Sequence, residues 1–172
     1  MVRDVVRELG YLTLGTRFKR IGERLQAQTQ RILDAHDPTV PAGQFPFLAA
    51  LDRSGPLSVG ELADAVGVTQ PGATRTIAQL AEAGHVVAAQ VAGDQRRRSI
   101  ALTAQGKRLV AAGKRTAWPL VESAVRELCR ELDGTLLEQL AALEDGLASE
   151  PLDRRAAEPL DRRVAARPRR RR

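Results

Sequence analysis

Residues 84–106 read GHVVAAQVAGDQRRRSIALTAQG. Two short runs in this stretch, residues 86–91 and 98–102, have the composition of β-strands, and between them Gly93 and Asp94 precede a row of three arginines. This pattern predicts a β-hairpin with a basic tip. Strand alternation places two side chains inward, Ile100 and Leu102, and leaves two outward, Ser99 and Ala101.

Two short helices are predicted directly before the hairpin. Ser58 is followed three residues later by Glu61, which is the spacing of a capping box at a helix start. Gly67 closes this helix, and Thr69 caps the next one, residues 70–83, which ends at Gly84. Two helices of this kind, joined by a turn that contains glycine, predict a helix-turn-helix.

The second of these helices carries a polar face in its amino-terminal half, opposite the apolar positions Ala73, Ile77 and Leu80. A recognition helix contacts base edges in the major groove with its amino-terminal residues. We expect Arg75 to pair with guanine and Gln70 with adenine. The candidate DNA contacts of the helix are Thr69, Gln70, Gly72, Thr74, Arg75 and Gln79, with Thr74 on a phosphate or a thymine methyl. The alternative is an ordinary solvated helix face.

The hairpin tip supplies the second group of candidate DNA contacts. Asp94 is close enough to Arg96 in sequence to hold its guanidinium in one pose, which suits entry into a narrow minor groove. Arg97 and Arg98 are expected on phosphates, where they add affinity without sequence preference. The alternative is a charged hairpin tip without a DNA partner.

The helical periodicity of residues 3–33 predicts one long helix at the amino terminus. A second helical region is predicted over residues 104–132, with an interruption at Trp118-Pro119. Asp133 is expected to cap a final helix over residues 134–148. The long first helix cannot bury its apolar positions against a small winged domain alone, so a partner subunit is expected.

The predicted fold class is therefore mainly α with a small β-hairpin wing, as a winged helix-turn-helix plus a helical dimerisation lobe. Residues 1–40 form the amino-terminal dimerisation helix and residues 41–103 the DNA-binding domain. Residues 104–148 form the carboxy-terminal dimerisation helices. Residues 149–172 form an arginine-rich tail, expected to be disordered because it has few apolar residues.

Charge is distributed unevenly along the chain. Its net charge is +6, of which residues 149–172, with nine arginines, supply +5. The sequence EPLDRRAA at residues 150–157 recurs as EPLDRRVA at residues 158–165. The tail either adds non-specific attraction to phosphates or is a functionless extension, whereas DNA binding by the nearly neutral remainder depends on local clusters such as Arg96 and its neighbours.

These residues resemble the MarR family of bacterial winged-helix regulators. The resemblance rests on GELADAVGVTQPGATRTIAQLAEAGHV at residues 60–86 and GDQRRRSIALTAQGKRL at residues 93–109. It implies an obligate homodimer on a pseudo-palindromic operator in double-stranded DNA, with half-sites about 34–36 Å apart. It also implies a small aromatic or anionic effector in a cleft between the lobes. The chain departs from the family at residues 87–89, where a basic residue is usual, and at Gly72, where Ser or Thr is common.

The effector site is less clearly marked in the sequence. The chain has only five aromatic residues, and the candidate pocket residues are Tyr11, His36, Phe45, Phe47 and Trp118, although core packing is the alternative for most of them. Cys129 is expected to be a buried structural thiol and not a redox sensor. His85 is expected to cap or pack at the end of the recognition helix, and with His36 it is too isolated for a metal site. No cofactor is expected.

The composition bounds the location and the class of protein. No apolar run approaches the roughly 20 residues that span a bilayer, and the amino terminus lacks a signal-peptide pattern, so a cytoplasmic protein is expected. No catalytic triad, metal-ligand cluster or phosphate-binding loop is present in the sequence, so an enzyme is not expected. The sequence predicts a homodimeric repressor that a small molecule releases from DNA. The alternative is a winged-helix scaffold for protein–protein contacts without specific DNA binding.

Overall fold

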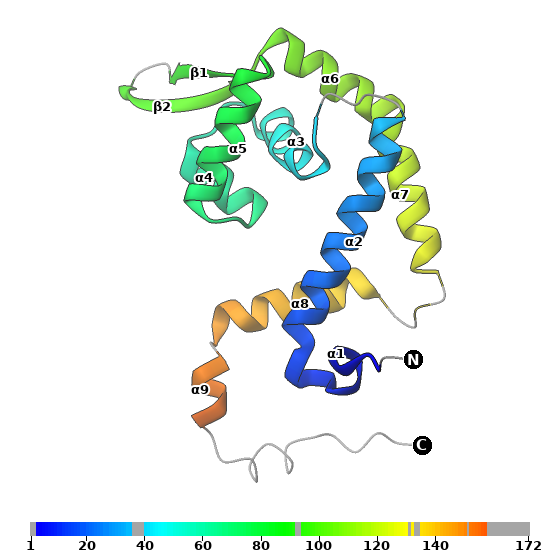
Figure 1. Cartoon of the computed structure of the whole chain (residues 1–172). Helices are drawn as coiled ribbons and strands as arrows, with labels where there is room; N and C mark the ends of the chain where they lie inside the picture. Colours follow the sequence, from blue (N-terminus) through cyan, green and yellow to red (C-terminus); the bar gives the residue numbers. More distant parts are fainter. Residues whose placement is uncertain are drawn as a thin grey trace. The chain divides into compact units, whose positions relative to one another are not determined.

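The computed structural model describes residues 3–35, 40–91, 94–130, 132, 135–150 and 152–157. For residues 90, 91, 94–98, 153, 156 and 157 it describes the backbone alone. The chain divides into two compact units, Met1–Val125 and Arg126–Arg172. Helices dominate both units, and a two-stranded hairpin lies in the first (Figure 1).

The first unit begins with a break where the sequence predicts one continuous helix. Helix α1 (Val5–Glu8) is followed by a 3₁₀ turn, η1 (Gly10–Thr13), and only then by α2 (Leu14–Asp34). The single helix expected over residues 3–33 is therefore wrong. Gly10 has a φ of +57°, a left-handed conformation that interrupts a right-handed helix and that glycine adopts without strain.

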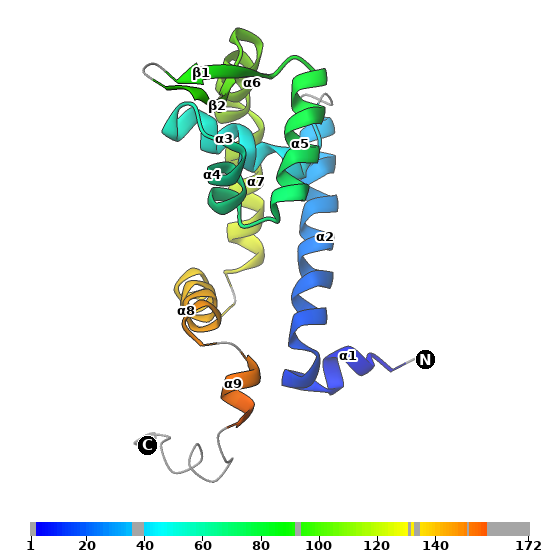
Figure 2. The ribbon, with the colours of Figure 1, turned by 90° about the vertical axis from the view of Figure 1, so that its left-hand side faces the viewer.

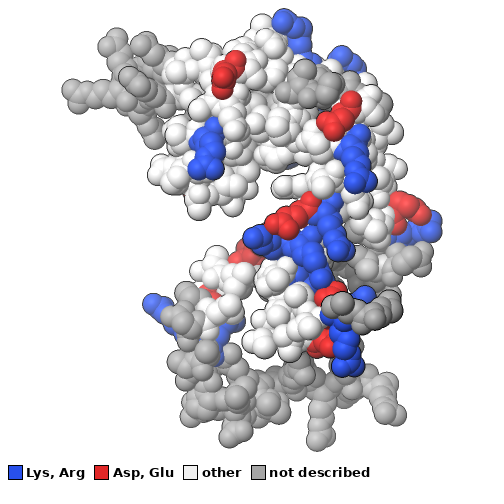
Figure 3. Space-filling view, viewed as in Figure 1, with Lys and Arg blue, Asp and Glu red and all other residues white. Residues whose placement is uncertain are grey.

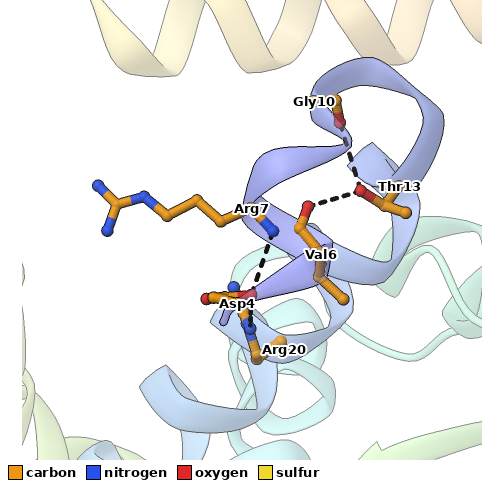
Figure 4. Close-up of polar contacts among 6 residues, drawn as sticks. All are labelled: Asp4, Val6, Arg7, Gly10, Thr13 and Arg20. Carbon is orange, nitrogen blue, oxygen red and sulfur yellow. Dashed lines mark hydrogen bonds and ion pairs between the residues drawn. The ribbon is translucent and has the colours of Figure 1, made fainter. Parts of the chain in front are cut away.

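Polar contacts hold this amino-terminal corner, which is drawn in Figure 4. The Thr13 hydroxyl donates to the Val6 carbonyl oxygen at 2.6 Å, so η1 is tied back to α1. The Asp4 carboxylate accepts hydrogen bonds from the Arg7 backbone amide at 3.1 Å and from the Arg20 guanidinium at 3.0 Å. Asp4 thereby caps α1 and joins it to α2.

The helix-turn-helix is confirmed. After a second 3₁₀ turn, η2 (Ala42–Gln44), come α3 (Phe45–Ser54), α4 (Val59–Val66) and α5 (Gln70–Glu82). Ser58 and Glu61 form the reciprocal capping box, Gly67 ends α4 with a φ of +73°, and the Thr69 hydroxyl caps α5.

One apolar core joins these helices to the hairpin and to the helix that follows it. Leu48 of α3, Leu62 of α4 and Leu80 of α5 are fully buried, as is Val110 of α6 (Ala104–Arg115). Figures 1 and 2 show α3 lying among α4, α5 and α6. This packing fixes α5 with its buried face inward and leaves its other face exposed.

The hairpin consists of β1 (Val86–Val91) and β2 (Asp94–Leu102), paired antiparallel from Val86 with Leu102 to Gln90 with Arg98. The register is irregular between Gln90 and Val91, and β2 begins four residues earlier than the strand expected at residues 98–102. The hairpin projects from the helices in both views (Figures 1 and 2). The mainly helical fold with a hairpin wing is as the sequence predicts.

The inward and outward assignment along β2 is only partly correct. Ile100 is buried, as expected, and exchanges two backbone hydrogen bonds with Leu57, at 3.1 and 2.7 Å. Ser99 is 2% exposed, however, so its predicted outward position is wrong. Its hydroxyl donates to the Ala89 carbonyl oxygen at 3.0 Å, which turns the small side chain back onto the paired strand.

Helix α6 is capped by Thr103 and separated by Thr116 from α7 (Ala117–Leu128). The sequence places this interruption at Trp118-Pro119, two residues too late. Pro119 lies in the first turn of α7, where a backbone N–H has no intrahelical acceptor and its absence costs little.

The second unit contains α8 (Leu136–Ser149) and α9 (Leu152–Ala157). Helix α8 begins after Thr135, and the cap expected at Asp133 lies outside the described residues. The Arg155 guanidinium donates to the carbonyl oxygens of Glu150 at 2.8 Å and Gly146 at 2.5 Å, at the carboxyl end of α8. Residues 152–157 of the tail are thus helical, where the sequence predicts disorder over residues 149–172. Arg155 of this helix satisfies carbonyl groups that the end of α8 leaves unpaired.

Within the described part of the chain, no helix is both long enough and apolar enough to cross a membrane.

Candidate nucleic-acid interface

Helix α5 has two chemically distinct faces. Ala73, Ile77 and Leu80 are at most 7% exposed and belong to the core. The candidate DNA contacts on the other face are exposed, apart from the half-buried Gly72: Thr69, Gln70, Thr74, Arg75 and Gln79. Core packing therefore determines which side chains of α5 reach solvent.

Arg75 is the basic residue of this exposed face. Its guanidinium forms no ion pair or hydrogen bond with any residue that the structure describes. An exposed guanidinium without an internal partner keeps all five of its donors for an external acceptor such as a guanine edge or a phosphate.

The hydroxyl of Thr74 is already engaged within the helix. It donates to the Gln70 carbonyl oxygen at 2.9 Å. Thr74 therefore presents a methyl group and oxygen lone pairs to the outside. In this rotamer the side chain suits a thymine methyl better than a phosphate, which needs a donor.

Gly72 lies against the cap of α5. Its backbone amide donates to Thr69 Oγ1 at 3.3 Å, and an added Cβ would lie 3.2 Å from the same oxygen. The glycine thus leaves room for the capping hydroxyl of Thr69.

Gln79 lies in the carboxy-terminal half of α5, and its side chain has a partner inside the protein. Its Oε1 accepts a hydrogen bond from Gln44 Nε2 at 3.0 Å. Nothing in the sequence distinguishes Gln44 from an ordinary polar residue, although it is only 9% exposed.

The wing residues Asp94, Arg96, Arg97 and Arg98 all lie on β2. The structure describes their backbone alone, so the predicted pose of Arg96 against Asp94 lies outside the described side chains. What the backbone establishes is their position: the strand that carries them leads back to the buried Ile100, which pairs with Leu57.

Charge does not form one large patch on the part of the surface that is drawn. Figure 3 shows basic and acidic side chains interspersed over α2, and a mostly neutral surface over α4 and α5. Contacts to DNA by this face would therefore depend on individual residues such as Arg75.

A cavity of about 420 Å³ lies in the first unit, with walls from α2, η2, α3 and α7. Of the candidate pocket residues, Phe45 and Trp118 line it, with their rings edge to face at 6.0 Å between centroids. Phe47 is instead a core residue at 2% exposed, Tyr11 is 90% exposed, and His36 lies outside the described residues. The cavity walls are largely apolar, and Thr29 and Glu122 supply polar groups.

Sequence reasoning missed most of this cavity wall. Leu33, Ala49 and Val121 line it together with the aromatic pair. Small and aliphatic residues of this kind carry no chemical signal in a sequence. Their role depends on which helices meet.

Among the residues that the structure describes, the remaining reactive side chains do not gather into a site. His85 packs at the end of α5 at 4% exposed, and its Nδ1 has no hydrogen-bond partner in the described structure. Cys129 is half-buried and lies one residue beyond α7. Among the described residues, no group of His, Cys, Asp and Glu side chains could hold a metal ion.

Comparisons with known proteins agree with this geometry. Residues 36–97, which include the helix-turn-helix and part of the hairpin, match the model of the MarR family. No curated protein matches the sequence of the chain.

Several solved structures share the fold. A MarR family transcriptional regulator from Silicibacter pomeroyi DSS is 25% identical, over 78% of this chain and 86% of that one, with a TM-score of 0.58. The S. aureus MepR–DNA complex is 23% identical over 83% and 96% of the two chains, with a TM-score of 0.62. Bordetella bronchiseptica BpsR, solved to explain regulation of its DNA binding by 6-hydroxynicotinic acid, is 18% identical over 74% and 94%, with a TM-score of 0.52.

The resemblance of the chain to MarR-family transcriptional regulators, which residues 60–109 suggest, is confirmed by the family model and by these structures.

Proposed function

We propose that the chain is a sequence-specific regulator of transcription that binds double-stranded DNA. The proposal starts from the winged-helix fold and from the match of residues 36–97 to the MarR family. The observation that carries the proposal is the exposed polar face of α5, held outward by the burial of Ala73, Ile77 and Leu80. The similarity to the MepR–DNA complex supports the same assignment.

In this proposal α5 enters the major groove and its amino-terminal half reads base edges. Arg75 binds guanine, Gln70 binds adenine, and the methyl group of Thr74 contacts thymine. Thr69, Gly72 and Gln79 complete the contact surface of the helix. On the wing, Asp94 orients Arg96 toward the minor groove, and Arg97 and Arg98 neutralise phosphates.

We further propose that two copies of the chain bind a pseudo-palindromic operator. Phe18 and Ile21 of α2 are 40% and 45% exposed in the isolated chain, and Leu12 is 81% exposed. Apolar side chains this exposed favour burial against another protein surface. A second copy satisfies this requirement and also supplies the second recognition helix.

The cavity beside Trp118 is the proposed effector site, and repression is relieved when a small molecule fills it. Its volume is within the range of small-ligand pockets, and its apolar walls with few polar groups are typical of them. The Phe45 and Trp118 rings favour an aromatic ligand. BpsR, with its regulation by 6-hydroxynicotinic acid, is a similar fold for which such control is described.

The DNA-binding proposal is tested with genomic fragments selected by the purified protein. Arg75→Ala should cost about 1–3 kcal/mol on the selected duplex and relax preference at one base position. Arg96→Ala should also weaken binding while the dimer stays intact. Arg24→Ala, an exposed arginine on α2, is the matched control and should bind as the wild type does.

The salt dependence of binding separates this proposal from a protein–protein scaffold. Binding to phosphates releases counterions, so the wild-type affinity should fall steeply as salt rises. Two results would contradict the DNA-binding assignment. One is an affinity for duplex DNA that does not change with salt concentration, and the other is an equal affinity of Arg75→Ala, Arg96→Ala and Arg24→Ala.

A further inference from the structure

Two side-chain hydrogen bonds connect α2 to the recognition helix through the turn η2. Gln30 of α2 accepts the Ala42 backbone amide on its Oε1 at 2.6 Å. Gln44, two residues further along the turn, donates from Nε2 to Gln79 Oε1 on α5 at 3.0 Å. The turn is therefore held at one end by α2 and reaches α5 at the other.

The Gln30 amide is itself held in one orientation. Its Nε2 donates to Asp34 Oδ1 one turn later in α2, at 2.7 Å. This bond directs the Gln30 oxygen toward Ala42. Gln30 therefore acts as an oriented acceptor and not as a freely rotating side chain.

Gln44 is buried, so the hydrogen bond of its side-chain amide affects the stability of this region. Its side chain is 9% exposed, and among the described residues its hydrogen-bond partner is Gln79. Its backbone amide donates to the Pro41 carbonyl oxygen at 2.9 Å, which fixes the turn. A buried amide is costly unless it is hydrogen-bonded, so Gln44 favours positions of α5 that keep Gln79 within reach.

The same turn forms part of the cavity wall. Ala42 and Phe45, which stand on either side of Gln44 in the chain, both line the cavity. A shift of η2 would therefore move the cavity wall and Gln44 together.

We propose that Gln44 is a positioning residue for the recognition helix. Through Gln79 it holds α5 to η2, and through Gln30 the turn is held to α2, so that the position of the DNA-reading helix follows α2 and the cavity wall. This inference rests on the proposed DNA-binding function. Gln30 and Gln44 act on DNA affinity only through α5.

The test compares full-length Gln30→Met, Gln44→Met and the double variant on the duplex that the wild type selects. Each single change should weaken binding about three- to tenfold, the effect expected from one neutral hydrogen bond. The double variant should bind no more weakly than the weaker single variant, because both changes break the same connection. Gln28 is an exposed glutamine on the same helix, α2. Gln28→Met is therefore the control, and it should bind DNA as the wild type does.

The salt slope distinguishes positioning from direct contact. Positioning leaves the number of neutralised phosphates unchanged, so the slope should match the wild type in every variant. The proposal would be overturned if the affinity losses of the two single variants added up in the double variant. It would also be overturned if Gln30→Met bound DNA as tightly as Gln28→Met. A salt slope about one unit shallower in Gln44→Met would overturn it too, by making Gln44 a phosphate contact.

Two further measurements cover a failure of Gln44→Met to fold and a failure of the proposed function. Gln79→Met breaks the same hydrogen bond from an exposed position. Because Gln79 is itself a proposed DNA contact, this variant is judged by hydrogen exchange of α5, which should be faster than in Gln28→Met. Hydrogen exchange of the α5 amides from Ile77 to Ala81 needs no DNA and should be faster in Gln30→Met than in Gln28→Met. If the wild type binds no duplex DNA, the proposed DNA-binding function is wrong. Equal hydrogen-exchange rates of the α5 amides in Gln30→Met and Gln28→Met would instead refute the connection between α2 and α5 through η2.

Discussion

Single residues set the ends of the helices in this protein. Ser58 and Glu61 exchange hydrogen bonds at 3.2 and 2.7 Å at the start of α4, and Thr103 accepts the Gly106 amide at 3.0 Å at the start of α6. The Thr103 hydroxyl also donates to the Gly84 carbonyl oxygen at 2.7 Å, so one side chain starts α6 and secures the end of the recognition-helix region. Such caps each contribute about 1 kcal/mol.

Asp4 is the residue whose protonation the structure changes most clearly. The Arg20 guanidinium, with the Arg7 backbone amide in second place, holds the pKa of this carboxyl below its ordinary value. A lowered folded-state pKa means that Asp4 stabilises its corner above the ordinary pKa of about 3.9. That stabilisation is lost as the pH falls through the lowered value.

We expect Arg20→Met to return the pKa of Asp4 toward its ordinary value, because the largest cause of the shift is removed. A carboxyl titration followed by ¹³C NMR measures this directly. Lys19→Met removes the neighbouring cation, which pairs with Glu23, and should leave Asp4 unchanged. An Asp4 pKa that is equal in wild type and Arg20→Met would show that the Arg20 contact is absent in solution.

At the scale of elements, close approach matters more than local propensity. Helix α6 passes so near the start of β1 that a Cβ added at Gly106 would lie 2.1 Å from the His85 carbonyl oxygen. That oxygen also accepts the Thr103 amide at 3.0 Å. The junction between the recognition helix, the wing and α6 therefore has no space for a methyl group at Gly106.

Gly106→Ala should destabilise the protein by about 1–3 kcal/mol, since backbone atoms must move to admit the new carbon. Urea unfolding of the two proteins measures the difference. The control is Gly15→Ala in α2, where nothing lies within 4 Å, and it should stabilise by up to about 1 kcal/mol through helix propensity. Equal stabilities of Gly106→Ala and wild type would mean that α6 does not approach His85 this closely.

At the scale of the whole molecule, the first unit carries apolar residues on α2 that its own elements leave exposed. Phe18 and Ile21 lie three residues apart on α2, which places them on one side of the helix. Their exposure is consistent with the proposed homodimer and with the amphipathic pattern of α2.

If the proposed dimer forms through α2, Ile21→Asp should convert it to monomer, because the change would place a carboxylate in an apolar interface, at a cost of several kcal/mol. Sedimentation equilibrium measures the change. Gln28→Asp adds the same charge at an exposed polar position of α2 and should remain dimeric. A wild-type monomer, or a dimeric Ile21→Asp, would remove α2 from the proposed interface.

Duplex binding by Ile21→Asp should also weaken, since the two recognition helices would no longer bind as a linked pair.

Short-range patterns in the amino-acid sequence are enough to predict the helix-turn-helix and the presence of a hairpin. The caps Ser58 and Thr69, the closing Gly67 and the spacing of Ile77 and Leu80 all act between residues a few positions apart. Contacts of that range are visible as spacings in a sequence, so the bounds predicted for α4 and α5 are nearly correct, whereas β2 begins four residues earlier than expected. The same short-range pattern predicts which residues of α5 are exposed.

The tertiary structure alone decided the features that depend on distant elements. It placed Phe45 beside Trp118 on a cavity but put Phe47 in the core, turned Ser99 inward, and brought Gln44 to Gln79. The partners of these residues lie 10 to 73 positions away or on another helix. Burial and cavity walls arise only when such elements pack together, which is why periodicity and capping rules did not reveal them.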